Sequence, residues 1–170
     1  MKFFKQKGQA ALEFLTTYGW AFLVILVMIG ALAGFGILTP SNFLPDRCNF
    51  ASELSCSESA IVADDETDFD PDLKLFLKNN IGNSVKIDPA DIEVESEYIS
   101  GTYTGCTIDG STDTATISAS DAVNITCSDM GEFPAPGEKA KIQVDLKYTP
   151  VGKNLAKAVQ GEIFTDIQVS

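Results

Sequence analysis

The sequence predicts an α+β protein, with one long apolar helix near the N-terminus followed by an all-β sandwich. No charged residue occurs from Phe14 to Pro45. Beyond Pro45, short segments alternate apolar and polar residues and are separated by turn signals, as half-buried strands are. At 170 residues, 45% of them hydrophobic, the chain has room for one ordinary domain and a short extra element.

The charge balance excludes several classes of function. The net charge is −12 and there is no histidine, whereas Lys2, Lys5 and Lys7 all lie in the first seven residues. Nucleic-acid binding needs clustered Lys and Arg, so we expect none. No nucleophile motif and no phosphate-binding loop is present, and nothing singles out one carboxylate for acid–base chemistry. We therefore expect no enzyme activity and no cofactor.

The apolar segment is long enough to cross a membrane. Phe14 to Leu38 is 25 residues, which as a helix is about 37 Å long against a hydrocarbon core of about 30 Å. Pro40 is expected to end it. The lysines before the segment and the acidic residues after it predict a cytoplasmic N-terminus and an extracytoplasmic remainder. No A-x-A-like cleavage site follows, so the segment is not an ordinary secretory signal.

Glu13 lies at the edge of this segment, next to Phe14. A carboxylate at that depth costs a few kcal/mol unless it finds a partner. Two interpretations remain open at this point. The side chain reaches the interface in a plain membrane anchor, or it pairs with a charge on another chain.

The run from Lys7 through Gly8, Gln9, Ala10, Ala11, Leu12 and Glu13 to Phe14, after a short basic leader, resembles the class III signal peptide of archaeal type IV pilins. Thr16 to Phe22 is also similar to members of that family. The resemblance implies that a prepilin peptidase cleaves between Gly8 and Gln9. It implies a leader at residues 1–8, a transmembrane and filament-core helix at residues 9–39, and an immunoglobulin-like β-sandwich head at residues 40–170.

The resemblance also implies how subunits stack. Cleavage gives Gln9 a free α-amine and makes Glu13 the fifth residue of the mature chain, where type IV pilins carry a glutamate. We expect the amine and the Glu13 carboxylate of a neighbouring subunit to pair and to fix the axial register. Gly30 and Gly34 have the small-x-x-x-small spacing that lets helices approach closely, although glycine is also simply common in membrane helices.

The β region is read from alternation. The expected strands are Leu73–Lys78, Val85–Ile87 with a break at Pro89, Ile92–Glu95, Tyr98–Tyr103, Ala115–Ile117, Val123–Cys127, Lys141–Tyr148 and Glu162–Val169. Asn154 to Val159 is expected to be a helical turn or a loop. About seven strands with turns between them favour a sandwich.

Four cysteines lie beyond the helix: Cys48, Cys56, Cys106 and Cys127. An even number in an exported domain predicts two disulfides, each worth about 2–4 kcal/mol. We favour the local pairing, Cys48 with Cys56 and Cys106 with Cys127, over the two other possible pairings. Zinc is the weaker alternative, because there is neither a C-x-x-C spacing nor a histidine.

Two further motifs allow modification or ion binding. Asn124-Ile125-Thr126 is the only N-x-S/T sequon, which makes Asn124 a candidate for N-glycosylation, although such triplets also arise by chance. The acidic stretch from Asp64 to Asp72 offers carboxylates to Ca²⁺. It lacks the Gly and the terminal Glu of an EF-hand loop, so we favour a solvated acidic loop and predict no metal site.

The expected function is that of a structural subunit of an archaeal type IV adhesion pilus. The precursor would be single-pass and membrane-anchored, and after cleavage the chain would join an extracellular surface filament. The expected partners are identical subunits in a helical filament, the prepilin peptidase, the pilus assembly machinery and, before assembly, the membrane. The alternatives are a minor pilin, a membrane-anchored cell-surface binding module and an archaellin-like filament subunit.

Overall fold

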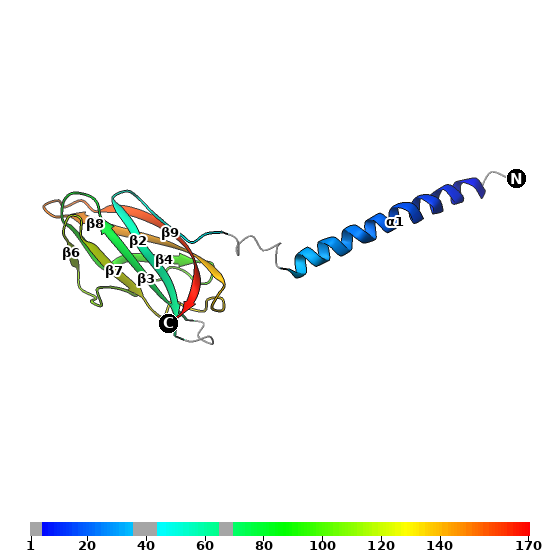
Figure 1. The fold of residues 1–170 in the computed structure, drawn as a ribbon. Coiled ribbons are helices and arrows are strands. Elements are labelled where there is room, and N and C mark those ends of the chain that lie inside the picture. The colour runs from blue at the N-terminus through cyan, green and yellow to red at the C-terminus, as the bar shows by residue number, and fades with distance from the viewer. Residues whose placement is uncertain (1–4, 36–43, 65–69) are drawn as a thin grey trace. The chain divides into compact units, whose positions relative to one another are not determined.

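The computed structural model describes residues 5–35, 44–64 and 70–170. It divides the chain into two compact units, Met1–Leu44 and Pro45–Ser170, and each is described here by itself. Figure 1 shows one helix in the first unit and the strands of the second. This is the predicted layout of an apolar helix followed by a mostly β region. The predicted helix breaker Pro40 and the predicted boundary between Thr39 and Pro40 lie outside the described residues.

Helix α1 spans Lys5–Gly34. It begins nine residues before Phe14, where the uncharged segment starts. Gln, Ala and Leu are strong helix formers, so residues 9–12 extend the helix toward the N-terminus. The part from Leu12 to Gly34 is long and apolar enough to cross a membrane.

The second unit holds nine strands among its described residues: β1 (Arg47–Phe50), β2 (Leu54–Ala63), β3 (Asp72–Asn79), β4 (Val85–Ser96), β5 (Cys106–Ile108), β6 (Ala115–Ile117), β7 (Ala122–Cys127), β8 (Lys139–Pro150) and β9 (Lys157–Val169). The segments predicted within β3, β4, β6, β7, β8 and β9 are strands, as expected from their alternation.

Hydrogen bonding joins these strands into one sheet, in the order β5-β7-β3-β2-β9-β8-β4-β6, with β1 paired to β9. The link between its two halves is the parallel pairing of β2 with β9, in which Ile61 lies opposite Ile167 and Ala63 opposite Val169. The predicted sandwich has two separate sheets, whereas here this short parallel contact makes the pairing continuous.

The core follows the period of two that the sequence shows. On β8, Ala140, Ile142, Val144, Leu146 and Tyr148 are all buried, and the residues between them are half-buried or exposed. Leu73, Leu75 and Leu77 on β3 form the matching buried row. The residues that face inward from all parts of the sheet form one hydrophobic cluster, so the β unit has its own core.

Two local predictions were wrong, and a third was right for only half of its length. Pro89 does not break the strand, since β4 runs through it with a register irregularity between Ile87 and Ile92, which leaves proline where no ladder donor is needed. The segment from Tyr98 to Tyr103 is mostly turn, and only Tyr103 forms a bridge, to Val94. Asn154 to Val159 begins as a loop and continues as strand from Lys157.

Gly161 sits in the middle of β9 and is covered by an aromatic ring. It lies opposite Phe50 of β1, and a Cβ atom at this position would overlap the Phe50 ring. An aromatic side chain over a strand glycine is a known way to fix register between strands. The ring of Phe50 therefore holds the short first strand against β9.

Candidate functional site

The first candidate site is the surface of α1. With the exception of the half-buried Val24, the large apolar side chains on this helix from Leu12 to Leu32 are more than two-fifths exposed, and none of the 23 residues from Leu12 to Gly34 is buried within the unit. Trp20 is 69% exposed and Phe35, just after the helix, is 80% exposed. Apolar surface of this extent needs a lipid or protein partner, because water does not stabilise it.

Glu13 lies at one end of this surface with an exposed side chain. The hydroxyls of Thr16 and Thr17 bind backbone oxygens, and Thr17 donates to the Glu13 carbonyl at 2.8 Å. No described side chain forms an ion pair with the Glu13 carboxylate. The pairing with a neighbouring subunit that the sequence predicts for Glu13 concerns a partner outside the described residues.

The predicted cleavage bond between Gly8 and Gln9 lies in the first turns of α1, four residues before Glu13. The side chains of residues 5–11 are outside the described part of the chain. The structure thus places the Gln9 backbone and Glu13 one helical turn apart.

The glycines of α1 have open space around them. A Cβ atom at Gly19, Gly30 or Gly34 would meet no atom within 4 Å. Each glycine costs an isolated helix about 1 kcal/mol relative to alanine, and no described atom lies close enough to pack against these positions. Small residues on an open helix surface instead allow the backbone of another helix to approach closely.

Both predicted disulfides are present, with the local pairing. Cys48 of β1 is joined to Cys56 of β2, and Cys106 of β5 is joined to Cys127 of β7. The second bridge links residues directly opposite each other, both almost fully buried. The first bridge ties the entry strand of the β unit to a strand inside the sheet.

Asn124, the sequon residue, lies within β7 opposite Phe76 of β3. Its backbone N–H donates to the Asp109 carboxylate at 3.1 Å, and its carbonyl accepts from the Asp109 N–H at 2.8 Å. Its side-chain oxygen is buried without a hydrogen-bond partner among the described residues. The side-chain amide of Asn124, to which a glycan would be attached, therefore lies on a regular strand of the folded unit.

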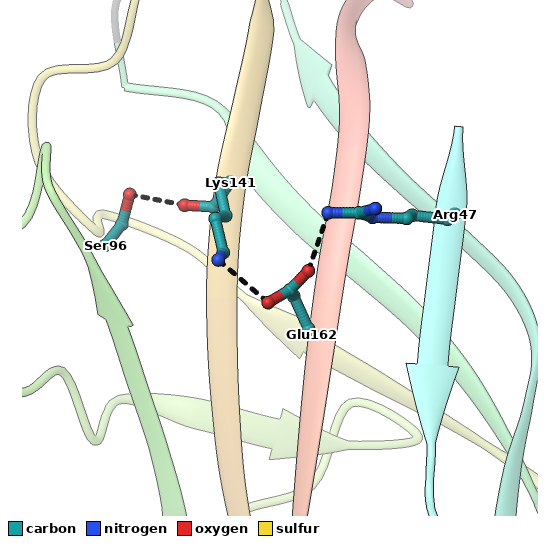
Figure 2. Close-up of polar contacts among 4 residues, drawn as sticks. All are labelled: Arg47, Ser96, Lys141 and Glu162. Atoms are coloured by element: carbon teal, nitrogen blue, oxygen red, sulfur yellow. Dashed lines mark hydrogen bonds and ion pairs between the residues drawn. The ribbon is translucent and has the colours of Figure 1, made fainter. Parts of the chain in front are cut away.

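The sequence did not reveal a charged network at the point where the chain enters the β unit (Figure 2). The Glu162 carboxylate of β9 accepts from Arg47 of β1 at 2.9 Å and from Lys141 of β8 at 2.8 Å. The Lys141 carbonyl in turn accepts from the Ser96 hydroxyl at the end of β4 at 2.9 Å. These residues are up to 115 positions apart in the sequence, so only the sheet register brings them together.

A second ion pair supports the same entry point. Lys139 of β8 pairs with Asp46, just before β1, and this hydrogen bond is the main reason that the pKa of Asp46 is lowered. Lys141, followed by Arg47, lowers the pKa of Glu162. The Phe164 ring lies between two cations, with Arg47 at 5.5 Å and Lys139 at 5.6 Å from its centroid. Charge pairs, ring contacts and a disulfide therefore hold β1 to its neighbours.

Metal binding finds no geometric support in the described residues, among which no group of three acidic or cysteine side chains is placed to hold an ion. Of the acidic stretch from Asp64 to Asp72, residues 65–69 lie outside the described part. Comparison of the chain with protein-family models and with curated proteins finds no match.

Proposed function

We propose that this chain is a structural subunit of an archaeal type IV adhesion pilus, which polymerises through α1 after a prepilin peptidase removes residues 1–8. The observation that supports this most is the helix surface. It combines apolar side chains without partners from Leu12 to Gly34 with a carboxylate at Glu13 and open glycines. A plain membrane anchor needs the first of these features but not the other two.

In this proposal α1 has two successive environments. Before assembly, Leu12–Gly34 spans the membrane, with the lysines of the leader on the cytoplasmic side. After cleavage, helices of identical subunits replace the lipid. The exchange is feasible because both surroundings are apolar, while pairing of Glu13 with the Gln9 amine of a neighbour satisfies two charges that neither environment solvates.

We further propose that the β unit is the pilus head and a variant of the immunoglobulin-like sandwich. In this variant the pairing of β2 with β9 joins the two layers. An exported location is supported by the two disulfides, which persist in oxidising surroundings. The network around Arg47, Glu162 and Phe164 holds β1 to its neighbouring strands. A head that is joined to its helix through this one short strand needs such contacts.

N-terminal sequencing of the membrane and filament fractions tests the proposal. A mature chain that starts at Gln9 and is recovered in sheared filaments is the expected result. The matched variant Glu13→Gln keeps the size of the side chain but removes its charge, and we expect it to be cleaved and yet to form few filaments. A chain that keeps Met1 and stays in the membrane would instead support the alternative of a membrane-anchored surface module.

A further inference from the structure

The β unit has two ends that differ in chemistry. The register of β8 with β9 places Lys139 opposite Asp166 at the end where β1 begins, which we call the entry end, and Tyr148 opposite Lys157 at the other, the far end. The loop of residues 151–156 between β8 and β9 is therefore at the far end. Residues 97–105, which follow β4, and residues 128–138, which precede β8, are at the entry end.

The far end presents an apolar loop tip beside cations. All residues from 151 to 158 are exposed. Leu155 is 77% exposed and Val151 is 48% exposed, and Lys153 and Lys157 lie beside Leu155 in the sequence. Leu155 is the most exposed large apolar side chain among the described residues of the β unit. The loop is anchored at its base, where the Val151 N–H donates to the Ser84 carbonyl at 2.9 Å.

The entry end contains a cleft of about 420 Å³, lined by Tyr98, Ile99, Ser100, Thr102, Tyr103, Met130, Gly131 and Glu132. Its aromatic walls are held in place. The Tyr98 ring packs on Phe133 with centroids 5.5 Å apart, and the Tyr103 hydroxyl donates to the carbonyls of Gly105 and Ser128. Burial raises the pKa of both tyrosines, as expected for rings that line a partly dry hollow.

The two segments that line the cleft are acidic. Residues 97–105 and 128–138 carry Glu97, Asp129, Glu132 and Glu138, and neither segment contains a Lys or Arg. Asp129 and Asp70 also raise the pKa of Tyr103, after burial. The far-end loop has the opposite character, with Lys153 and Lys157 beside its apolar tip. The far-end loop and the segments that line the cleft thus complement each other in apolar surface and in charge.

We propose that the loop of residues 151–156 of one copy docks into the entry-end cleft of a second copy. Leu155 enters the cleft, and Lys153 and Lys157 face Glu97, Asp129 and Glu132. This inference rests on the proposed function, because it names the contact between neighbouring heads in the filament. Contact through two different surfaces is head-to-tail, and its repetition produces an open row of subunits where the rotation between copies does not close a ring.

The loop of residues 151–156 cannot reach the cleft of its own chain. The loop and the cleft lie at opposite ends of β8, and a strand of 12 residues is about 40 Å long. A second chain must therefore supply the loop. Among partners, an acidic protein or a phosphate-bearing ligand would be repelled by the acidic rim, whereas the basic loop of another copy is attracted to it.

Zero-length cross-linking in filaments of the full-length protein tests the contact. A carbodiimide joins a lysine to a carboxylate only where the two are in contact. In filaments that mix ¹⁴N- and ¹⁵N-labelled chains, we expect Lys153 or Lys157 to be linked to Glu97, Asp129 or Glu132 in peptides of mixed label. Filaments without any such link would overturn the docking and leave the proposed function standing, whereas chains that never form filaments would overturn both.

Substitution provides an independent check. We expect Leu155→Ser to weaken the contact about tenfold, because a leucine leaves a packed site, and to lower the yield of the cross-link. Phe76→Ser, on the outer face of β3 and 37% exposed, is the matched control and should leave the yield unchanged. Reversal of Lys153 and Lys157 to Glu should abolish the link, and the added changes Glu97→Lys and Glu132→Lys should restore a link between the exchanged charges. Equal effects of Leu155→Ser and Phe76→Ser would contradict the proposal.

Discussion

Asn79 offers the sharpest test of how the far end of the β unit is built. It is only 1% exposed at the end of β3. Its side-chain amide donates to the carbonyls of Asn83, Ile117 and Ser118 at 2.9, 3.3 and 3.1 Å. Its side-chain oxygen accepts from the Ile81 N–H at 3.0 Å. One side chain thus fixes two loops, the one between β3 and β4 and the one that follows β6. In the first loop, the Ser84 carbonyl accepts from the Val151 N–H at the base of the loop that carries Leu155.

Removal of this amide should destabilise the β unit strongly. A hydrogen bond contributes about 1 kcal/mol net, and a buried partner left unsatisfied costs about 1–3 kcal/mol. Of the four partners, the Ile117 carbonyl is in a buried contact and the other three are partly buried, so water replaces some of the lost bonds. We therefore expect Asn79→Ala to lower the free energy of unfolding by about 2–4 kcal/mol, a fall of about 10 °C in melting temperature.

Calorimetry or denaturant titration of the oxidised protein measures this change. The neighbouring Asn80 is the matched control, because it is exposed and its amide binds the Ser55 hydroxyl at 2.7 Å. Asn80→Ala should cost less than about 1 kcal/mol. If Asn79→Ala and Asn80→Ala have equal stability, the buried amide does not organise the far end. Asn79→Asp adds a sign test: its carboxylate faces three carbonyl oxygens, so the destabilisation should diminish as the pH falls and the acid becomes neutral.

Three more outcomes follow from the entry strand. Gly161→Ala should cost about 1–3 kcal/mol by overpacking against Phe50, and Phe50→Leu in the same chain should recover part of that loss in a denaturant titration; no recovery would exclude a ring clash as the cause. Replacement of Cys48 and Cys56 by serine should lower the free energy of unfolding by about 2 kcal/mol without loss of fold, and the melting temperature should fall with it. An unchanged melting temperature would show that the bridge adds nothing to stability. The pKa of Glu162 is lowered in the folded state, so the stabilisation is present above the unfolded pKa and is lost as the pH falls through the folded value. Denaturant midpoints of wild type should therefore fall more steeply than those of Glu162→Gln below about pH 5, and parallel curves would contradict this.

The sequence predicted those elements whose pattern is local. A run without charges is enough to predict α1, and the strict alternation in β8 and β9 is enough to predict two long strands with one buried face. Strand β2 was missed because a bulge between Cys56 and Glu58 interrupts its register with β3 and therefore its alternation. Tyr98 to Tyr103 was expected as a strand, since tyrosine and isoleucine favour strands, but Gly101 has a φ of 94°, which ends regular pairing.

The candidate site was predictable to a smaller degree for the same physical reason. Glu13 can be recognised in the sequence from its position next to an apolar run, and the cysteines can be recognised from their residue type. Arg47, Glu162 and Lys141 look like ordinary surface charges in the sequence, and only the register of β1, β9 and β8 brings them into contact. Asn79 is a similar case. Asn79 and Asn80 together indicate a turn, but nothing local tells which of the two is buried.

The two proposed interfaces differ in strength, and that difference assigns them different roles. In the proposed filament, the mostly apolar helix surface from Leu12 to Gly34 supplies most of the stability through helix packing. The contact between heads is small, and exposed pairs such as Lys153 with Glu132 contribute about 0–1 kcal/mol each. Once helices hold two heads together, however, the second contact forms within one assembly at a high effective concentration, and weak complementarity is sufficient. The helices then decide whether subunits assemble, and the loop of residues 151–156 decides how the heads are aligned.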